Sequence, residues 1–145
     1  MKLDGDSFKR TIVQVKVVAD TNTFLAVALN EPEKEWLVQA TAGCDLVAPT
    51  LLPYEIGNAL SALARRGLIA PSQLRTAWDA AAGIPVELIA VDCCASLLLA
   101  GRFQIYAYDA YFLQCSLDKR IPLLTLDRSM KRIAKQLDIT LVNCR

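Results

Sequence analysis

Four acidic residues lie inside, or at the end of, otherwise apolar segments of this chain, and they are the side chains best suited to chemistry. They are Asp20, Glu55, Asp109 and Asp127. Carboxylates that are crowded together repel one another strongly unless a cation lies between them. Carboxylate oxygens are also the ligands that hard divalent cations prefer. If the fold gathers these four acids, the sequence therefore predicts a divalent metal site.

Histidine is absent from the chain, and this absence narrows the chemistry further. The chain lacks the most frequent general base, a common zinc ligand and the base of every Ser-His-Asp triad. We therefore expect an enzyme with this sequence to use acidic side chains and a hard metal ion.

Each acid also has a purely structural interpretation. Asp20 and Asp127 both precede short polar sequences that suit the N-cap of a helix. Glu55 could be a solvent-facing residue of a first helical turn. Asp109 could also cap a helix, but it stands among tyrosines and alanines, where an unpaired buried charge would be costly. The functional interpretation therefore depends on the four acids as a set.

Short apolar segments alternate with amphipathic ones, and this pattern predicts alternating strands and helices. The expected strands are 15–20, 46–48, 86–91, 123–126 and 139–142. The expected helices are 21–30, 31–43, 51–66, 71–83, 92–102, 109–118 and 128–137. This spacing fits right-handed crossovers into a mostly parallel sheet. We expect a three-layer α/β/α domain around a central sheet of four to five strands.

Sites in such sheets form beyond the carboxyl ends of the strands, which is where Asp20 and Asp127 are expected. Basic residues follow directly, with helical spacing: Arg128, Lys131, Arg132 and Lys135. This basic group is either a solvated helix face or a phosphate-binding rim around the acidic pocket.

The length of 145 residues fits one domain with a substantial core. We expect residues 1–14 to be an N-terminal extension without the apolar core of a signal peptide, and residues 15–145 to be the domain. No apolar run reaches the roughly 18–20 residues of a membrane span, so we expect a cytosolic protein. The five cysteines show no metal-binding spacing and are expected to be small buried hydrophobic residues.

On four segments the chain resembles the PIN-domain family, and within it the VapC-type toxin ribonucleases of toxin–antitoxin systems. The segments are Val17-Val-Ala-Asp-Thr-Asn22, Pro53-Tyr-Glu-Ile-Gly-Asn-Ala-Leu60, Tyr108-Asp-Ala-Tyr-Phe-Leu113 and Leu124-Thr-Leu-Asp-Arg128. Each is similar to a family segment that carries one of the four acids, and they stand in the family's order. The first acid lies further from the N-terminus than is usual in the family.

The resemblance implies a PIN-like fold and a metal-dependent endoribonuclease that hydrolyses RNA phosphodiester bonds. It implies that one or two Mg²⁺ or Mn²⁺ ions are held by Asp20, Glu55, Asp109 and Asp127. Asn22 and Thr125 would be supporting polar groups, and Arg128 could neutralise the scissile phosphate. The resemblance gives no role to Asp92, which also stands between a strand and a helix, so we interpret Asp92 as a helix cap.

The resemblance also implies a homodimer and a small antitoxin protein whose tail would lie along apolar helices and reach the acidic pocket. A PIN nuclease of RNA processing, or an inactive RNA-binding PIN module, would carry the same acids without an antitoxin. A phosphotransfer domain is disfavoured by two positions. A haloacid-dehalogenase-type phosphatase needs a second Asp where Asn22 stands, and a receiver needs a Lys after the strand that ends before Asp127.

Overall fold

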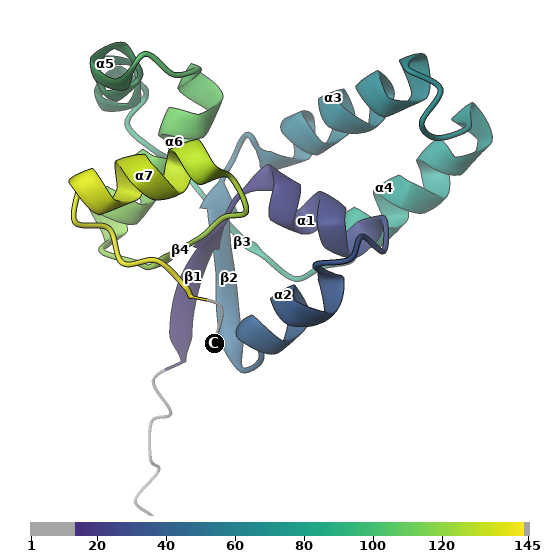
Figure 1. Cartoon of the computed structure of the whole chain (residues 1–145), viewed down its shortest axis with the longest axis horizontal. Helices are drawn as coiled ribbons and strands as arrows, with labels where there is room; N and C mark the ends of the chain where they lie inside the picture. Colours follow the sequence, from purple (N-terminus) through teal and green to yellow (C-terminus); the bar gives the residue numbers. More distant parts are fainter. Residues whose placement is uncertain (1–13, 144–145) are drawn as a thin grey trace, which may run out of the picture.

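The computed structural model describes residues 14–143, so the predicted extension lies outside the described residues except for its last member. Four parallel strands form one sheet in the order β3-β2-β1-β4 (Figure 1). They are β1 (Val15–Ala19), β2 (Cys44–Pro49), β3 (Glu87–Ile89) and β4 (Leu123–Leu124). The predicted fifth strand is reduced to a single parallel bridge between Leu123 and Leu141. The expected parallel sheet of four to five strands is confirmed.

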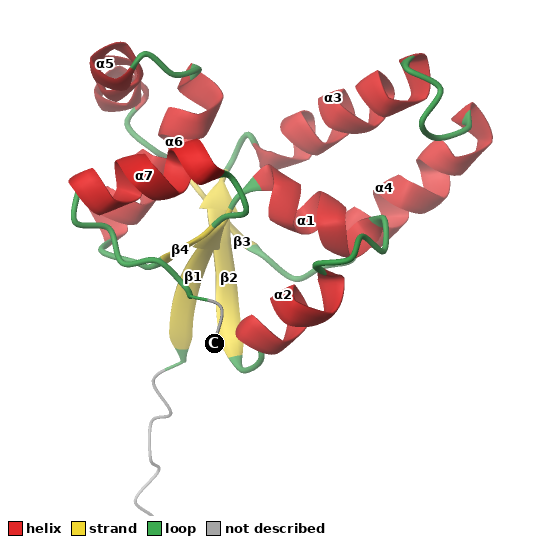
Figure 2. Ribbon diagram, viewed as in Figure 1, coloured by secondary structure: helices red, strands yellow, loops and turns green. Residues whose placement is uncertain are grey.

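Helices fill the segments between the strands. They are α1 (Thr21–Ala28), α2 (Lys34–Ala40), α3 (Leu52–Arg65), α4 (Leu74–Ala82), α5 (Cys93–Phe103), α6 (Ala107–Lys119) and α7 (Arg128–Gln136). A 3₁₀ turn, Pro71–Gln73, precedes α4. Figure 2 shows the sheet between two groups of helices, α1 to α4 on one side and α5 to α7 on the other. The three-layer α/β/α architecture is therefore confirmed.

The strand order places a change of direction between β1 and β4. From β1 the chain crosses to β2 and then β3 through α1 to α4, whereas from β4 it continues through α7 to Leu141 at the other edge. The connection that follows β1 therefore lies on one face of the sheet, and the connection that follows β4 lies on the other. In open α/β sheets the crevice at such a switch point is where ligands bind. Asp20 and Asp127 follow these two strands.

The core is apolar on both faces of β1, as expected for a strand at the centre of a parallel sheet. Val18 packs into the larger cluster with Phe24 and Leu113, while Val17 packs into a second cluster with Leu37. This rigid centre supports the strand ends. None of the helices between residues 14 and 143 is long and apolar enough to cross a membrane.

The expectation that the cysteines are buried is wrong for two of them. Cys93 and Cys94 are exposed in the first turn of α5, Cys44 is half-buried and Cys115 is buried. Position 144 lies outside the described residues. The sequence does not show which side of α5 faces the core, and the first turn of this helix faces solvent.

Candidate functional site

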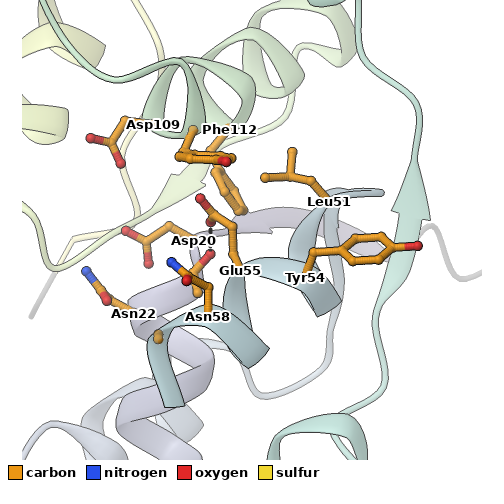
Figure 3. A pocket seen from close by; sticks show the side chains of 11 residues that line it. Asp20, Asn22, Leu51, Tyr54, Glu55, Asn58, Asp109 and Phe112 are labelled. Carbon is orange, nitrogen blue, oxygen red and sulfur yellow. Dashed lines mark hydrogen bonds between the residues drawn. The ribbon is translucent and has the colours of Figure 1, made fainter. Parts of the chain in front are cut away.

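A pocket of about 330 Å³ opens between the first turns of α1, α3 and α6, at the carboxyl end of β1. Acidic, amide and aromatic side chains line it, among them Asp20, Asn22, Tyr54, Glu55, Asn58, Tyr108, Asp109 and Phe112. In Figure 3, the carboxylates of Asp20, Glu55 and Asp109 surround the same space. Three of the four predicted acids therefore meet in one pocket, although they come from three separate segments.

Asp20 is 4% exposed and is held by hydrogen bonds at both carboxylate oxygens. Oδ1 accepts from the backbone N–H of Thr23 at 3.0 Å and from its hydroxyl at 2.7 Å, so Asp20 is the N-cap of α1. Oδ2 accepts from the hydroxyl of Thr125. Burial raises the pKa of Asp20, whereas the hydrogen bonds from Thr125 and Thr23 lower it. The charge of Asp127 raises it further. Asp20 thus caps a helix and also presents a fixed charge to the pocket.

Glu55 lies in the first turn of α3 and faces the pocket rather than solvent. Its carboxylate accepts a hydrogen bond from the hydroxyl of Thr21. Burial raises the pKa of Glu55, and the neighbouring charges of Asp109 and Asp20 raise it further. The pKa of Glu55 therefore depends on the charges of both other pocket acids.

Asp109 does not cap a helix. The sequence places the start of this helix at residue 109, but α6 begins at Ala107 with Tyr106 as its N-cap, so Asp109 lies within the first turn. Its side chain is half-buried against the pocket. Burial raises the pKa of Asp109, and the charges of Asp127 and Asp20 raise it further.

Asp127 is the N-cap of α7, with Oδ1 accepting from the backbone N–H of Met130 at 2.7 Å. It is half-buried and does not line the pocket itself. Its charge nevertheless raises the pKa of both Asp20 and Asp109. The fourth acid therefore stands behind the pocket, at the junction of β4 and α7.

The predicted supporting residues have different surroundings. Thr125 is 3% exposed and links two acids, because its hydroxyl donates to Asp20 and accepts from the backbone N–H of Asp127 at 3.0 Å. Asn22 is an exposed residue of α1 that lines the pocket. Arg128 is exposed at the first position of α7, outside the pocket lining.

Four further residues near the acids have no function predicted from the sequence. Asn58 and Tyr54 line the pocket from α3, and Tyr108 lines it from α6. Thr21 bonds to Glu55. The spacing of Asn58, three residues after Glu55, placed it near that acid on the helix surface. The two tyrosines carry no comparable signal, because exposed and buried tyrosines look alike in a sequence.

The donor set has the chemistry that a hard divalent cation requires, namely carboxylate, amide and hydroxyl oxygens. The shared rise in the carboxyl pKa values reflects burial in the pocket first, and the neighbouring negative charges second. Within residues 14–143, however, no three acidic or cysteine side chains stand in position to hold one ion. Hydroxyl and amide donors occupy both oxygens of Asp20. The residues fit Mg²⁺ or Mn²⁺ in kind, and holding one ion would require the carboxylates to come closer together than they lie here.

Comparisons with known proteins agree with the fold. The model of the PIN domain family matches residues 17–136. PAE2754 from Pyrobaculum aerophilum has a similar structure, with a TM-score of 0.61 and 22% identity, covering 81% of this chain and 85% of that one. VapBC2 from Rickettsia felis, whose structure was solved bound to a DNA fragment from its promoter, is also similar. The TM-score is 0.62 and the identity 14%, and the match covers 88% of this chain and 97% of that one. At such identities the likeness concerns the fold alone. No curated protein matches the chain.

Proposed function

Because the chain belongs to the PIN domain family, we propose that it is a metal-dependent endoribonuclease, the toxin of a VapC-type toxin–antitoxin pair. PIN domains are in general nucleases. The observation that carries the proposal is the meeting of three carboxylates in one pocket, from the ends or first turns of three separate elements. Asp127 stands close enough behind them to act on two of their pKa values.

The four acids would hold the cation, and each would contribute differently. Asp20 is fixed by its three hydrogen bonds and provides an oriented charge. Asp109 is half-buried, and no hydrogen bond lowers its pKa, so its side chain can turn towards an ion. A bound Mg²⁺ or Mn²⁺ would supply Lewis-acid activation of water and stabilise the leaving oxygen. This chemistry needs no histidine.

The pocket rim supports a nucleic-acid strand as the substrate. Tyr54 and Tyr108 line the pocket but are 82% and 58% exposed, which is unusual for large aromatic side chains. Exposed aromatic rings stack on unpaired bases, which is how many proteins hold single-stranded RNA. The amides of Asn22 and Asn58 can hydrogen-bond to phosphate or ribose oxygens in the same space. Arg128 follows Asp127 directly and would neutralise a phosphate beside the cut.

The test is cleavage of a mixed RNA pool by the purified protein, with Mg²⁺ or Mn²⁺ against a chelator. We expect cleavage that requires the metal and falls at least about a hundredfold in Asp109→Asn, since a missing charged ligand weakens both binding and catalysis. Asp92→Asn is the matched control. Asp92 is an exposed N-cap of α5 whose Oδ1 accepts from the N–H of Ala95 at 2.9 Å, outside the pocket.

Two results would overturn this proposal. Equal damage from Asp92→Asn and Asp109→Asn would mean that the pocket is not the site. The absence of cleavage with any metal, by a folded and partner-free protein, would favour an inactive RNA-binding PIN module. The finding that no three acidic or cysteine side chains of residues 14–143 are ready to hold an ion makes this second outcome worth testing first.

We propose two protein partners and a cytosolic location on the same basis. The first partner is a small antitoxin, and a hollow lined by the segments that follow α1 and α3 and by α4, with Leu63 and Leu68, offers apolar surface for its tail. The second is another copy of this chain, and the exposed Leu97 and Leu98 of α5 provide apolar surface outside the acidic pocket. Co-purification with the product of a neighbouring gene and the mass of the particle in solution would test the two separately.

A further inference from the structure

One helix carries a concentrated positive charge that the acidic pocket does not use. In α7, Met130, Ile133 and Ala134 are buried against the domain. The remaining surface of the helix carries four cations, which we call the α7 basic face: Arg128, Lys131, Arg132 and Lys135. Three of them are exposed and Lys131 is half-buried. The helix contains no acidic residue.

These cations have no acidic partners in the described part of the chain. The ion pairs among residues 14–143 join Lys16 to Glu87 and Arg75 to Asp79, and neither involves α7. Arg132 has one weak contact, a 3.5 Å hydrogen bond to the hydroxyl of Ser129. Four cations close together on a short helix repel one another, so an anionic ligand would stabilise the face.

The basic face begins at the candidate site. Thr125 joins the end of β4 to Asp20, and the backbone N–H of Asp127 bonds to the same hydroxyl immediately before α7 starts. In Figure 1, α7 lies in front of α6, with its first turn towards α1 and its last turn at the far left. The four cations therefore lie along one line, which runs from the side of the pocket outwards.

The pocket itself lacks positive charge, because no lysine or arginine is among the residues that line it. A polyanionic strand entering it meets three carboxylates, so its remaining phosphates need cations nearby. Building on the proposed function, we propose that the α7 basic face binds the backbone phosphates of the RNA strand on one side of the cut. The helix is about 13 Å long, which spans several phosphates of one strand.

The test compares two double variants that remove the same charge. Arg132→Gln/Lys135→Gln alters the exposed outer half of the basic face and spares Arg128. Arg65→Gln/Arg66→Gln is the matched control, because both arginines are exposed at the end of α3, roughly 15 Å along the helix from Glu55. Binding of a short single-stranded RNA is measured by fluorescence anisotropy in chelator, at several salt concentrations.

We expect the α7 variant to bind RNA roughly tenfold more weakly at 0.1 M salt. The slope of its plot of log K against log salt should be smaller in magnitude by about one to two, because binding releases fewer counterions when phosphate contacts are lost. The control should retain wild-type binding and slope. In cleavage, the α7 variant should raise KM more than it lowers kcat.

Binding in chelator does not depend on cleavage, so the two proposals can fail separately. An inactive protein that still binds RNA through α7 would overturn the nuclease function and support this inference. Equal RNA binding by both variants, or no binding by the wild type, would overturn the inference and leave the basic face to another anion, such as an acidic protein segment.

Discussion

The hydroxyl of Thr125 donates a hydrogen bond of 2.5 Å to Oδ2 of Asp20, although 105 residues separate the two in the sequence. The same hydroxyl accepts from the backbone N–H of Asp127 at 3.0 Å. It therefore connects the ends of β1 and β4, which are neighbours in the sheet. Through this buried side chain, the position of one acid depends on the position of another.

Replacing Thr125 with valine should disturb the site without changing the shape of the side chain much. The variant leaves Oδ2 of Asp20 without its donor in a nearly dry environment. Loss of a hydrogen bond to a buried charged group should lower the free energy of unfolding by about 2 kcal/mol. We also expect slower metal-dependent RNA cleavage, because Asp20 can turn. Urea unfolding and a cleavage assay measure the two effects.

The control is Thr140→Val, since Thr140 is exposed and its side chain has no hydrogen bond among the described residues. It should leave both stability and cleavage near wild-type values. A Thr125→Val protein with wild-type stability and cleavage would show that the hydrogen bonds of Thr125 contribute neither to stability nor to activity.

Asp127 combines a capping role with a proposed metal-binding role, and two substitutions separate them. Asparagine caps helices about as well as aspartate, so Asp127→Asn should change stability in chelator by less than about 0.5 kcal/mol while cleavage collapses. Asp127→Ala should lose the cap as well, at a further cost of about 1 kcal/mol. If Asp127→Asn cleaves RNA normally, its carboxylate is only a cap.

Much of the fold could be predicted because the relevant signals are local. Apolar runs end at Asp20 and Asp127, and helices end near Gly43, Gly67 and Gly83, so the strand and helix order follows from neighbouring residues. The boundaries of the elements depend also on residues that are distant in the sequence. The predicted strand 139–142 survives only as one bridge at Leu141, because pairing at a sheet edge depends on distant β4 rather than on its own residues.

The candidate site could be predicted as a set of residue types but not as a geometry. Asp20 is both a helix cap and a pocket residue, although the sequence presents these two interpretations as alternatives. The bond from Thr21 to Glu55 and the exposure of Tyr54 depend on how α1 and α3 pack together. Such contacts join residues far apart in the chain, and no local pattern encodes them.

The order in which a thiol reagent modifies the cysteines should follow their exposure. Burial, with a smaller effect of Asp118, raises the pKa of the Cys115 thiol to about 11. Because the thiolate is the reactive form, Cys115 should stay unmodified in the native protein at pH 8, while Cys93 and Cys94 react quickly. Thiol titration of native and urea-unfolded protein, with a Cys93→Ser/Cys94→Ser variant as control, measures this. Fast modification of Cys115 in the native protein would contradict its buried position in α6.

The raised pKa values of the pocket acids predict how stability changes with pH when no metal is present. Burial raises the pKa of Asp20, Glu55 and Asp109, and acidic neighbours add to the rise. The folded protein then keeps protons that the unfolded chain releases. This contribution to stability is complete below the ordinary values of 3.8 for Asp and 4.5 for Glu and is lost as pH rises through the folded values. In chelator, the pocket should therefore destabilise the protein at neutral pH.

Asp109→Asn isolates that effect, because it removes one charge of the pocket without removing a helix cap. In chelator at pH 7, we expect the variant to be more stable than the wild type, with a smaller loss of stability as the pH rises above the ordinary carboxyl values. Saturating Mg²⁺ should reverse the order, since an ion at a hundred times its Kd stabilises the folded wild type by about 2.7 kcal/mol. Urea unfolding across pH, with and without Mg²⁺, measures both effects. Equal responses of the two proteins to pH and Mg²⁺ would show that Asp109 neither interacts with the other acids nor binds the ion.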